Sequence, residues 1–277
     1  MRWDPGHRSN DLIDRRGEGP SGGGGLPITL LFWILRSPLG WVGVILVLIG
    51  WGVVRLLDGG FAVEGGDPGS DEDAAFVGFV LDDVQDHWAR GWSGYERAKL
   101  VLFRDSTRTA CGFGDAATGP FYCPADRQVY LDLSFFAALH KQLGAPGDFA
   151  QAYVIAHEIG HHLQTLDGTS AKVHAAPQRD QKGAGGMSVR LELQADCYAG
   201  VWAGDAERRG LLEVGDLDEA LRAAAAIGDD RLQRMGRGTV SPETFSHGTS
   251  AQRARWFRTG YTQRTAAACD TFSVREP

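Results

Sequence analysis

The sequence predicts an α+β domain, mainly helical with a small sheet, behind one N-terminal transmembrane helix. Apolar residues at helical spacing recur through most of the 277 residues, and only the short runs 99–104 and 128–133 have strand character. Hydrophobic residues make up 43% of the chain and charged residues 23%, as expected for a folded globular portion. One long apolar stretch, residues 26–57, precedes that portion.

This apolar stretch has the composition of a membrane anchor. Residues 39–57 would form a helix of roughly 28 Å, about the thickness of the hydrocarbon core. Residues 26–35 are too short to cross the membrane alone. The alternative for the whole apolar stretch is a helix buried in the protein core. Arginines precede the span, and after Arg55 no lysine or arginine follows until Arg90. We therefore expect a single-pass protein of the cytoplasmic membrane, with its N-terminus inside and its folded C-terminal domain extracytoplasmic.

The flanking segments differ from the domain in composition. Residues 1–25 are polar and end in four glycines, which predicts a disordered cytoplasmic tail. Residues 58–73 are rich in glycine, aspartate and proline and fit a flexible linker, so the folded domain is expected over residues 74–277. The net charge of −7 argues against a nucleic-acid partner. The oligomeric state is not predicted.

Four cysteines, Cys111, Cys123, Cys197 and Cys269, allow three disulfide pairings. We favour Cys111–Cys123 with Cys197–Cys269, because the first two flank a short loop rich in glycine and proline. Disulfides would fit an extracytoplasmic domain. Four reduced, buried thiols in a cytosolic enzyme are the alternative.

The first half of the domain is expected to contain one helix, a pair of strands and a second helix. Apolar spacing predicts a helix over residues 74–90. Strands are expected over 99–104 and 128–133, separated by a glycine-rich loop at 111–123. A helix over 135–143 follows.

A central helix is predicted to begin at Asp148, with Gln151 completing a capping-box-like pair, and to end at Gly168. Gly160 lies inside it, which indicates either a close backbone or substrate approach or a merely tolerated glycine. Residues 167–187 are expected to form a long loop. Four later helices are predicted to start at Ser188, at Asp216, near Arg231, and at Thr249 or Ser250.

The central helix carries the pattern H-E-x-x-H at His157, Glu158 and His161. Residues four apart lie on one helix face, so the two imidazoles can bind one metal ion. Glu158 lies about 100° further round the helix. There it can act as a general base toward a metal-activated water. The alternative to metal binding is a core helix whose histidines are hydrogen-bonded within the protein.

The third ligand is expected from the helix after Ser188. Glu192 and Asp196 lie four apart among apolar residues, where two carboxylates need a partner. We assign Glu192 as the third zinc ligand and Asp196 as the acceptor for a ligand histidine's other N–H group. The reverse assignment, or a structural pair with Arg190 or another arginine, remains an alternative.

H-E-x-x-H followed by E-x-x-x-D resembles the Glu-zincin metallopeptidases. More narrowly, the chain resembles the bacterial membrane-anchored "putative neutral zinc metallopeptidase" family. The matching stretches cover most of residues 108–260 and read CGFGDAATGPFYCPADRQVYLDLSFF, GDFAQAYVIAHEIGHHLQ, SVRLELQADCYAGVWA and FSHGTSAQRARWF. The resemblance implies a zincin-like domain, a catalytic Zn²⁺ ion, a peptidase-type site and a membrane address. It implies little about the substrate.

The predicted function is a membrane-anchored zinc-dependent metalloendopeptidase with Glu158 as general base, acting on a peptide or protein substrate. His247, just before the last helix, is a candidate donor to the oxyanion, although it could instead fix that turn. The strand at 128–133 is a candidate edge for an extended substrate, with Tyr130 as a further donor. His162 is rotated away from the ligands and is left outside the site. The alternative function is a catalytically weak, zinc-stabilised binding or scaffold protein.

Overall fold

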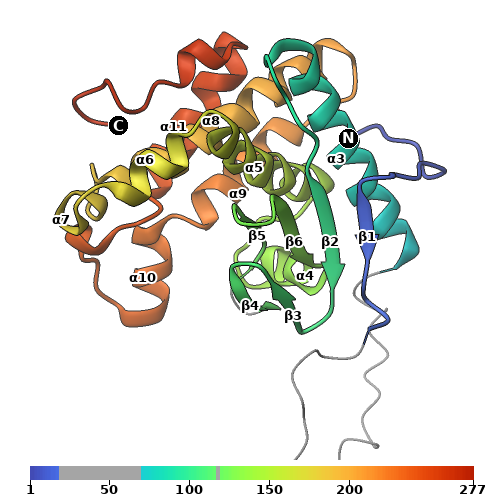
Figure 1. Cartoon of the computed structure of the whole chain (residues 1–277), viewed down its shortest axis with the longest axis horizontal. Helices are drawn as coiled ribbons and strands as arrows, with labels where there is room; N and C mark the ends of the chain where they lie inside the picture. Colours follow the sequence, from blue (N-terminus) through green and yellow to red (C-terminus); the bar gives the residue numbers. More distant parts are fainter. Residues whose placement is uncertain (19–69, 117–118) are drawn as a thin grey trace, which may run out of the picture. The chain divides into compact units, whose positions relative to one another are not determined.

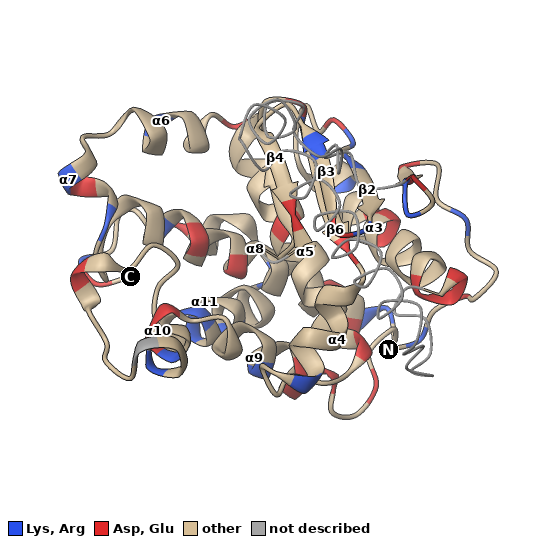
Figure 2. Ribbon diagram, turned by 90° about the horizontal axis from the view of Figure 1, so that it is seen from below, with Lys and Arg blue, Asp and Glu red and all other residues tan. Residues whose placement is uncertain are grey.

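The computed structural model describes residues 1–18, 70–116 and 119–277, which belong to one compact unit (Figure 1). The predicted anchor at 26–57 and residues 58–69 of the predicted linker lie outside the described residues. The linker prediction is wrong for residues 70–73, because a helix begins at Asp71 with Ser70 as its N-cap. None of the helices that are described has the length and apolar character needed to span a membrane. Acidic and basic residues are both spread over the ribbon (Figure 2).

The main sheet has four strands in the order β1–β2–β6–β5. Strands β1 (Leu12–Asp14), β2 (Lys99–Phe103) and β6 (Gln128–Asp132) run parallel, and β5 (Phe121–Cys123) pairs antiparallel with β6. Strands β3 (Ser106–Thr109) and β4 (Gly112–Asp115) form a separate antiparallel pair. Both predicted strands are confirmed, and the expected loop at 111–123 also contains β4 and β5.

Strand β2 is buried on both faces of the sheet. Leu100 and Leu102 belong to the main core, whereas Val101 and Phe103 belong to a smaller cluster with Tyr130. This alternation follows from the period of two in a strand. The main core extends from the sheet into the helices.

The helices account for most of the unit, as predicted. They are α3 (Asp71–Gly91), α4 (Ser134–Lys141), α5 (Asp148–Leu166), α6 (Thr169–Ala175), α7 (Gln178–Gln181), α8 (Met187–Arg208), α9 (Asp216–Ala226), α10 (Asp229–Arg237) and α11 (Ser250–Gln263). Short 3-10 turns occur at η2 (Pro242–Thr244) and η3 (Ala266–Cys269).

Three local predictions about these helices are wrong. Helix α8 begins at Met187 with Gly186 as its N-cap, and not at Ser188. Residues 167–187 contain α6 and α7, because Gly168 adopts a left-handed conformation with φ 80° and lets a new helix start at once. Helix α5 begins at Asp148 as predicted, but its N-cap is Gly147 and no side chain caps it. The predicted pairing of Asp148 with Gln151 is therefore not formed. The cap at Thr249 is confirmed, with Gln252 completing a capping box.

Helix α5 packs closely against α8, and Gly160 is the point of closest approach. A Cβ atom at Gly160 would lie 2.9 Å from the Cα atom of Ala195. The close-approach interpretation of this glycine is thus confirmed. Because Ala195 immediately precedes Asp196, this contact fixes the distance between the two helices that carry the predicted ligands.

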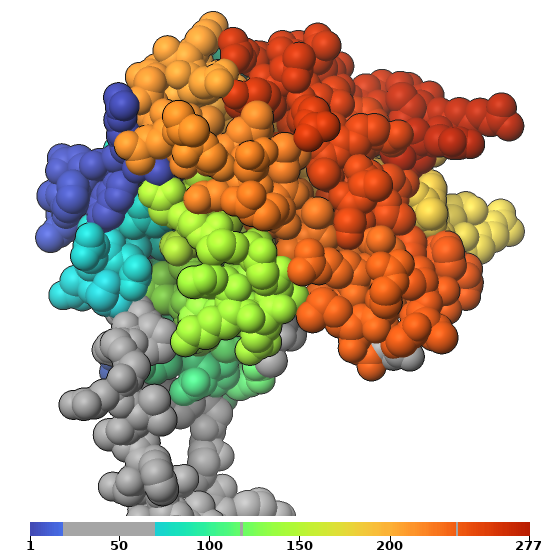
Figure 3. Space-filling model, turned by 180° about the vertical axis from the view of Figure 1, so that it is seen from behind, coloured from blue at the N-terminus to red at the C-terminus, as the bar shows by residue number. Residues whose placement is uncertain are grey.

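Residues 1–18 are part of the unit, so the predicted disordered tail is wrong for these residues. Strand β1 pairs with β2, Met1 is buried, and Trp3 meets Phe76 edge to face at 5.3 Å. Figure 3 shows these residues in blue against the cyan helix α3. Their polar composition was misleading because polar groups such as Asp11 have charged partners elsewhere in the domain.

Both favoured disulfides are present. Cys111 is bonded to Cys123, and Cys197 on α8 is bonded to Cys269 in η3. The second bond ties the C-terminal part of the chain to the helix that carries Glu192.

Candidate metal centre and active site

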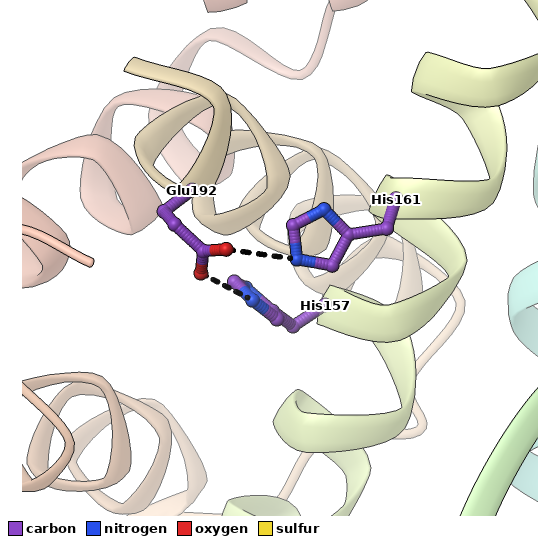
Figure 4. Close-up of side chains that lie close together, drawn as sticks. All are labelled: His157, His161 and Glu192. Atoms are coloured by element: carbon purple, nitrogen blue, oxygen red, sulfur yellow. Dashed lines mark ion pairs between the residues drawn. The ribbon is translucent and has the colours of Figure 1, made fainter. Parts of the chain in front are cut away.

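The structure brings the three predicted metal ligands together (Figure 4). The Nε2 atom of His157 lies 3.3 Å from Oε2 of Glu192, and the Nε2 atom of His161 lies 3.4 Å from Oε1 of the same carboxylate. One ligand atom from each residue lies within 4.8 Å of the others. Two turns of α5 and one of α8 therefore present two nitrogens and one oxygen to a common point.

The other ring nitrogen of each histidine is held by an acceptor. Nδ1 of His157 donates to Asp196 at 2.9 Å, and Nδ1 of His161 donates to the amide oxygen of Gln164 at 2.9 Å. Gln164 is itself fixed, because its Nε2 donates to the carbonyl of Leu191 at 2.7 Å. These contacts leave both Nε2 atoms directed at Glu192. The geometry favours the predicted roles, with Glu192 at the metal position and Asp196 supporting His157.

Arg253 on α11 is a part of the site that the sequence analysis missed. Its Nε and Nη2 donate to the two carboxylate oxygens of Asp196 at 2.8 and 2.9 Å. Nη2 also donates to the hydroxyl of Tyr153 at 3.2 Å, and that hydroxyl donates to Asp196 at 2.5 Å. Arg253 is only 2% exposed. A buried guanidinium needs such partners, and here they are the groups that hold His157.

A sequence signal for Arg253 existed. It lies three and four residues before Trp256 and Phe257, which are the buried aromatic residues of α11. An arginine on the apolar face of a helix indicates a buried acidic partner. Arg190, which was the named candidate for pairing with these carboxylates, donates to the carbonyls of Thr271 and Val274, whereas another arginine, Arg253, pairs with Asp196.

The neighbouring charged groups strongly shift the pKa values of His157, Glu192 and Asp196. Burial acts to lower the pKa of His157, but the Asp196 and Glu192 carboxylates outweigh it and raise that pKa to about 9. Burial acts to raise the pKa of Glu192, but His161 and His157 hold it well below its ordinary range. Burial also opposes ionisation of Asp196, yet Arg253 and His157 lower its pKa. A metal ion must displace a proton from His157, so its binding weakens as the pH falls.

Glu158 and His247 line the same cavity as the ligands, with a volume of about 910 Å³. Glu158 is 7% exposed and is not part of the three-ligand cluster. The Nδ1 atom of His247 lies 3.2 Å from Oδ1 of Asp229, and the other oxygen of Asp229 accepts the backbone N–H groups of residues 246–248. The Asp229 hydrogen bond raises the pKa of His247. Asp229 thus holds His247 beside the metal position.

The rest of the cavity wall is largely apolar or aromatic. The lining includes Pro120, Phe121, Tyr122, Phe135, Leu143, Val154, Leu191, Ile227 and Leu232. Ser170 and His174 of α6 also contribute, so the segment expected to be a loop does border the cavity. The cavity can accept a chain with apolar side chains next to the metal position.

The predicted edge strand is wrong. Strand β6 is paired on both sides, with β2 and β5, and β5 is the strand at the end of the sheet. Tyr130 is buried, and its hydroxyl donates to Asp126 at 2.8 Å, so it is not a donor in the cavity. The neighbouring strand β5 contributes Phe121 and Tyr122 to the cavity instead. Residues 121–123 were predicted to lie in a loop, so β5 was not expected to be the edge strand of the sheet.

His162 lies outside the cavity, as predicted. It is fully buried, with its Nδ1 atom 3.0 Å from the Tyr122 hydroxyl and its Nε2 atom 2.6 Å from the carbonyl of Glu96. It links α5 to β5. The edge strand is therefore fixed relative to the metal-binding helix.

The ligand set fits zinc. Two imidazole nitrogens and one carboxylate oxygen supply three protein ligands and leave one position for a reacting molecule, as in catalytic rather than structural zinc sites. Their acceptors Asp196 and Gln164 complete the arrangement that such sites require. With a glutamate alongside that is no ligand, the fold and the site define a metallopeptidase of the H-E-x-x-H type.

Comparison with known sequences gives the family. The chain belongs to the family described as "Putative neutral zinc metallopeptidase", whose model matches residues 1–272. It is 44% identical to "Uncharacterized protein YpfJ" of Escherichia coli strain K12, over 98% of this chain and 99% of that protein. It is also 44% identical to "Uncharacterized protein Mb2605" of Mycobacterium bovis and "Uncharacterized protein Rv2575" of Mycobacterium tuberculosis strain H37Rv. These matches cover 68% of this chain and 67% of each relative. No solved structure matches the chain.

Proposed function

We propose that the protein is a zinc-dependent metalloendopeptidase that hydrolyses peptide bonds in a peptide or protein substrate. The observation that carries this proposal is the position of Glu158, which lines the cavity beside the three ligands without belonging to them. A structural zinc site usually has four protein ligands and gains nothing from a base. The family assignment supports the same conclusion.

Each group in the cavity has a role in this reaction. Zinc held by His157, His161 and Glu192 would polarise the scissile carbonyl and lower the pKa of a bound water to about 7. Glu158 accepts the proton of the attacking water and passes it to the leaving amine. His247 donates a hydrogen bond to the oxyanion that forms on the carbonyl.

The substrate would lie along β5. This strand ends the sheet and contributes to the cavity wall, so an extended peptide can pair with its backbone while its side chains enter the apolar lining. This proposal replaces the predicted role of β6. His162 and Tyr122 would keep the bound peptide at a constant distance from Glu158.

We propose that this activity is located at the cytoplasmic membrane, with the catalytic domain on the extracytoplasmic side. The two disulfides support an oxidising compartment. The apolar composition of residues 26–57 supports attachment to the bilayer.

The substitution Glu158→Gln tests the mechanism. It keeps the shape of the side chain and removes the base, so zinc content should stay unchanged while cleavage of denatured casein falls by about 10²–10⁴-fold. Zinc content distinguishes the third ligand from its neighbour. The Glu192→Ala variant should lose more zinc than the Asp196→Ala variant. Wild-type cleavage by the Glu158→Gln variant would refute the mechanism. Zinc binding without proteolysis in the wild-type protein would support the alternative of a binding or scaffold protein.

A further inference from the structure

The two described segments that flank residues 19–69 meet at one point of the unit. Nη1 of Arg16 donates to the carbonyl of Ser70 at 3.1 Å, and Nη2 of Arg16 lies 3.1 Å from the carboxylate of Asp71. Arg16 is also paired with Asp14 at 2.7 Å. The ends of the two described segments therefore lie close together in the unit.

The residues before this point are built into the sheet that supports the active site. The backbone N–H of Leu100 donates to the carbonyl of Asp11 at 2.9 Å, and that of Arg15 donates to Leu102 at 2.8 Å. Between them, β1 pairs with β2 in parallel register. Strand β2 in turn pairs with β6, the neighbour of the edge strand β5. Without β1, the edge of β2 would be left unpaired.

A buried charge cluster strengthens the same attachment. Asp11 is 7% exposed and accepts from Arg97 at 2.5 Å and from Lys99 at 2.7 Å. Two N-terminal residues also bind Asp82 on α3: Nε2 of His7 lies 2.8 Å from its Oδ2 atom, and the Ser9 hydroxyl donates to its Oδ1 atom at 2.9 Å. Removing the N-terminal residues would deprive Lys99 and Arg97 of Asp11, although Arg97 would keep Asp82 and Asp86 as partners.

Two of the arginines that predicted a cytoplasmic N-terminus, Arg2 and Arg16, have acidic partners in the unit. Arg16 is paired with Asp14 and Asp71, and Arg2 lies 3.7 Å from Glu213. The fold gives these two arginines a role of their own, so the charge bias before the apolar stretch is a weaker signal of orientation. A single crossing between residues 18 and 70 would place about 30 Å of hydrocarbon between two groups of residues that share backbone hydrogen bonds.

We infer that residues 1–18 lie on the same side of the membrane as the metal site. Docking of residues 1–18 onto a neighbouring copy would not alter this inference, because every copy has the same orientation. The inference replaces the predicted single-pass topology.

Single-cysteine labelling tests this inference directly. All four native cysteines are in disulfides, so Asn10→Cys and Arg258→Cys, both at exposed positions, each introduce one reactive thiol. Sealed membrane vesicles of both orientations are treated with a membrane-impermeant maleimide, and detergent-opened vesicles give the full signal. We expect both cysteines to react in vesicles of the same orientation. Reaction in opposite orientations would overturn the inference.

A cross-link provides the second measurement. A Cβ atom at Gly78 would lie 3.1 Å from Cβ of Ser9, slightly closer than the 3.5–4.5 Å usual for a disulfide. The double variant Ser9→Cys/Gly78→Cys should therefore form an internal disulfide in membranes under mild oxidation. Ser9→Cys/Arg258→Cys is the control, since α11 lies away from residues 1–18 (Figures 1 and 3). Absence of the cross-link in membrane-bound protein would show that residues 1–18 are not docked there, and would refute the inference. Neither measurement depends on proteolysis, so a failure here is distinct from a failure of the proposed function.

Discussion

Replacing Gly160 by alanine should weaken both folding and zinc binding. The new Cβ atom would lie 2.9, 3.0 and 3.1 Å from the Cα, Cβ and O atoms of Ala195, all atoms that cannot rotate away. Ordinary carbon–carbon contact is about 3.5–4.0 Å, so α5 and α8 must separate locally by about 0.6 Å or more. Metal–ligand distances tolerate only about 0.2 Å. The shift therefore moves Glu192 out of reach of the position that His157 and His161 define.

The expected magnitudes follow from two opposing effects. Alanine inside a helix is favoured over glycine by up to about 1 kcal/mol, whereas overpacking costs about 1–3 kcal/mol. We expect a net loss of up to about 2 kcal/mol in the free energy of unfolding. Zinc affinity should fall by about 10–100-fold, as is usual when support around a ligand is disturbed.

Urea unfolding in the presence of a chelator measures the stability term, and competition with a chromophoric chelator measures zinc affinity. Gly236→Ala in α10 is the matched control, because nothing lies within 4 Å of its Cβ position. This control should be as stable as the wild type or more stable, with unchanged zinc affinity. If Gly160→Ala behaves like Gly236→Ala in both assays, the contact between α5 and α8 does not set the ligand geometry.

Two further predictions concern the supports of the histidines. Arg253→Met leaves the buried carboxylate of Asp196 without its cation and should lower the free energy of urea unfolding by about 3–5 kcal/mol. The double variant Arg253→Met/Asp196→Asn should recover part of this loss. If the losses of the two single variants simply add in the double variant, Arg253 and Asp196 do not stabilise the fold as a pair. Asp229→Asn removes the negative charge of the acceptor that raises the pKa of His247. The protonated form that donates from both ring nitrogens then persists only to a lower pH, so the alkaline limb of kcat/KM should move to lower pH. An unmoved limb would exclude His247 as the donor.

The parts of the site that could be predicted from sequence are those that depend on spacing within one helix. His157, Glu158 and His161 share a helix, and Glu192 and Asp196 share another, so the four-residue spacing was sufficient to group them. That both pairs meet was inferred from chemistry, because buried carboxylates and imidazoles need a common partner. The structure places them as that argument requires.

The parts that were missed depend on contacts between distant segments. Strand β1 pairs with residues almost 90 positions away, and its three residues have no pattern that announces a partner. Strand β5 is equally short, and its identity as the edge follows only from its pairing with β6. Arg253 lies 57 residues from Asp196. Local periodicity contains no information about which of several arginines reaches which carboxylate.

The position of Glu192 depends on both faces of α8. On one face Gly160 allows α5 to approach Ala195; on the other, a Cβ atom at Gly200 would lie 2.0 Å from the carbonyl oxygen of Phe257 on α11. Arg253 comes from that same part of α11 and holds Asp196 against His157. Helix α8 is thus fixed between the helix that supplies the histidines and the helix that supplies their buried cation. A peptidase site that must position three ligands within a fraction of an ångström gains this accuracy from backbone contact on both sides, which flexible side chains could not provide.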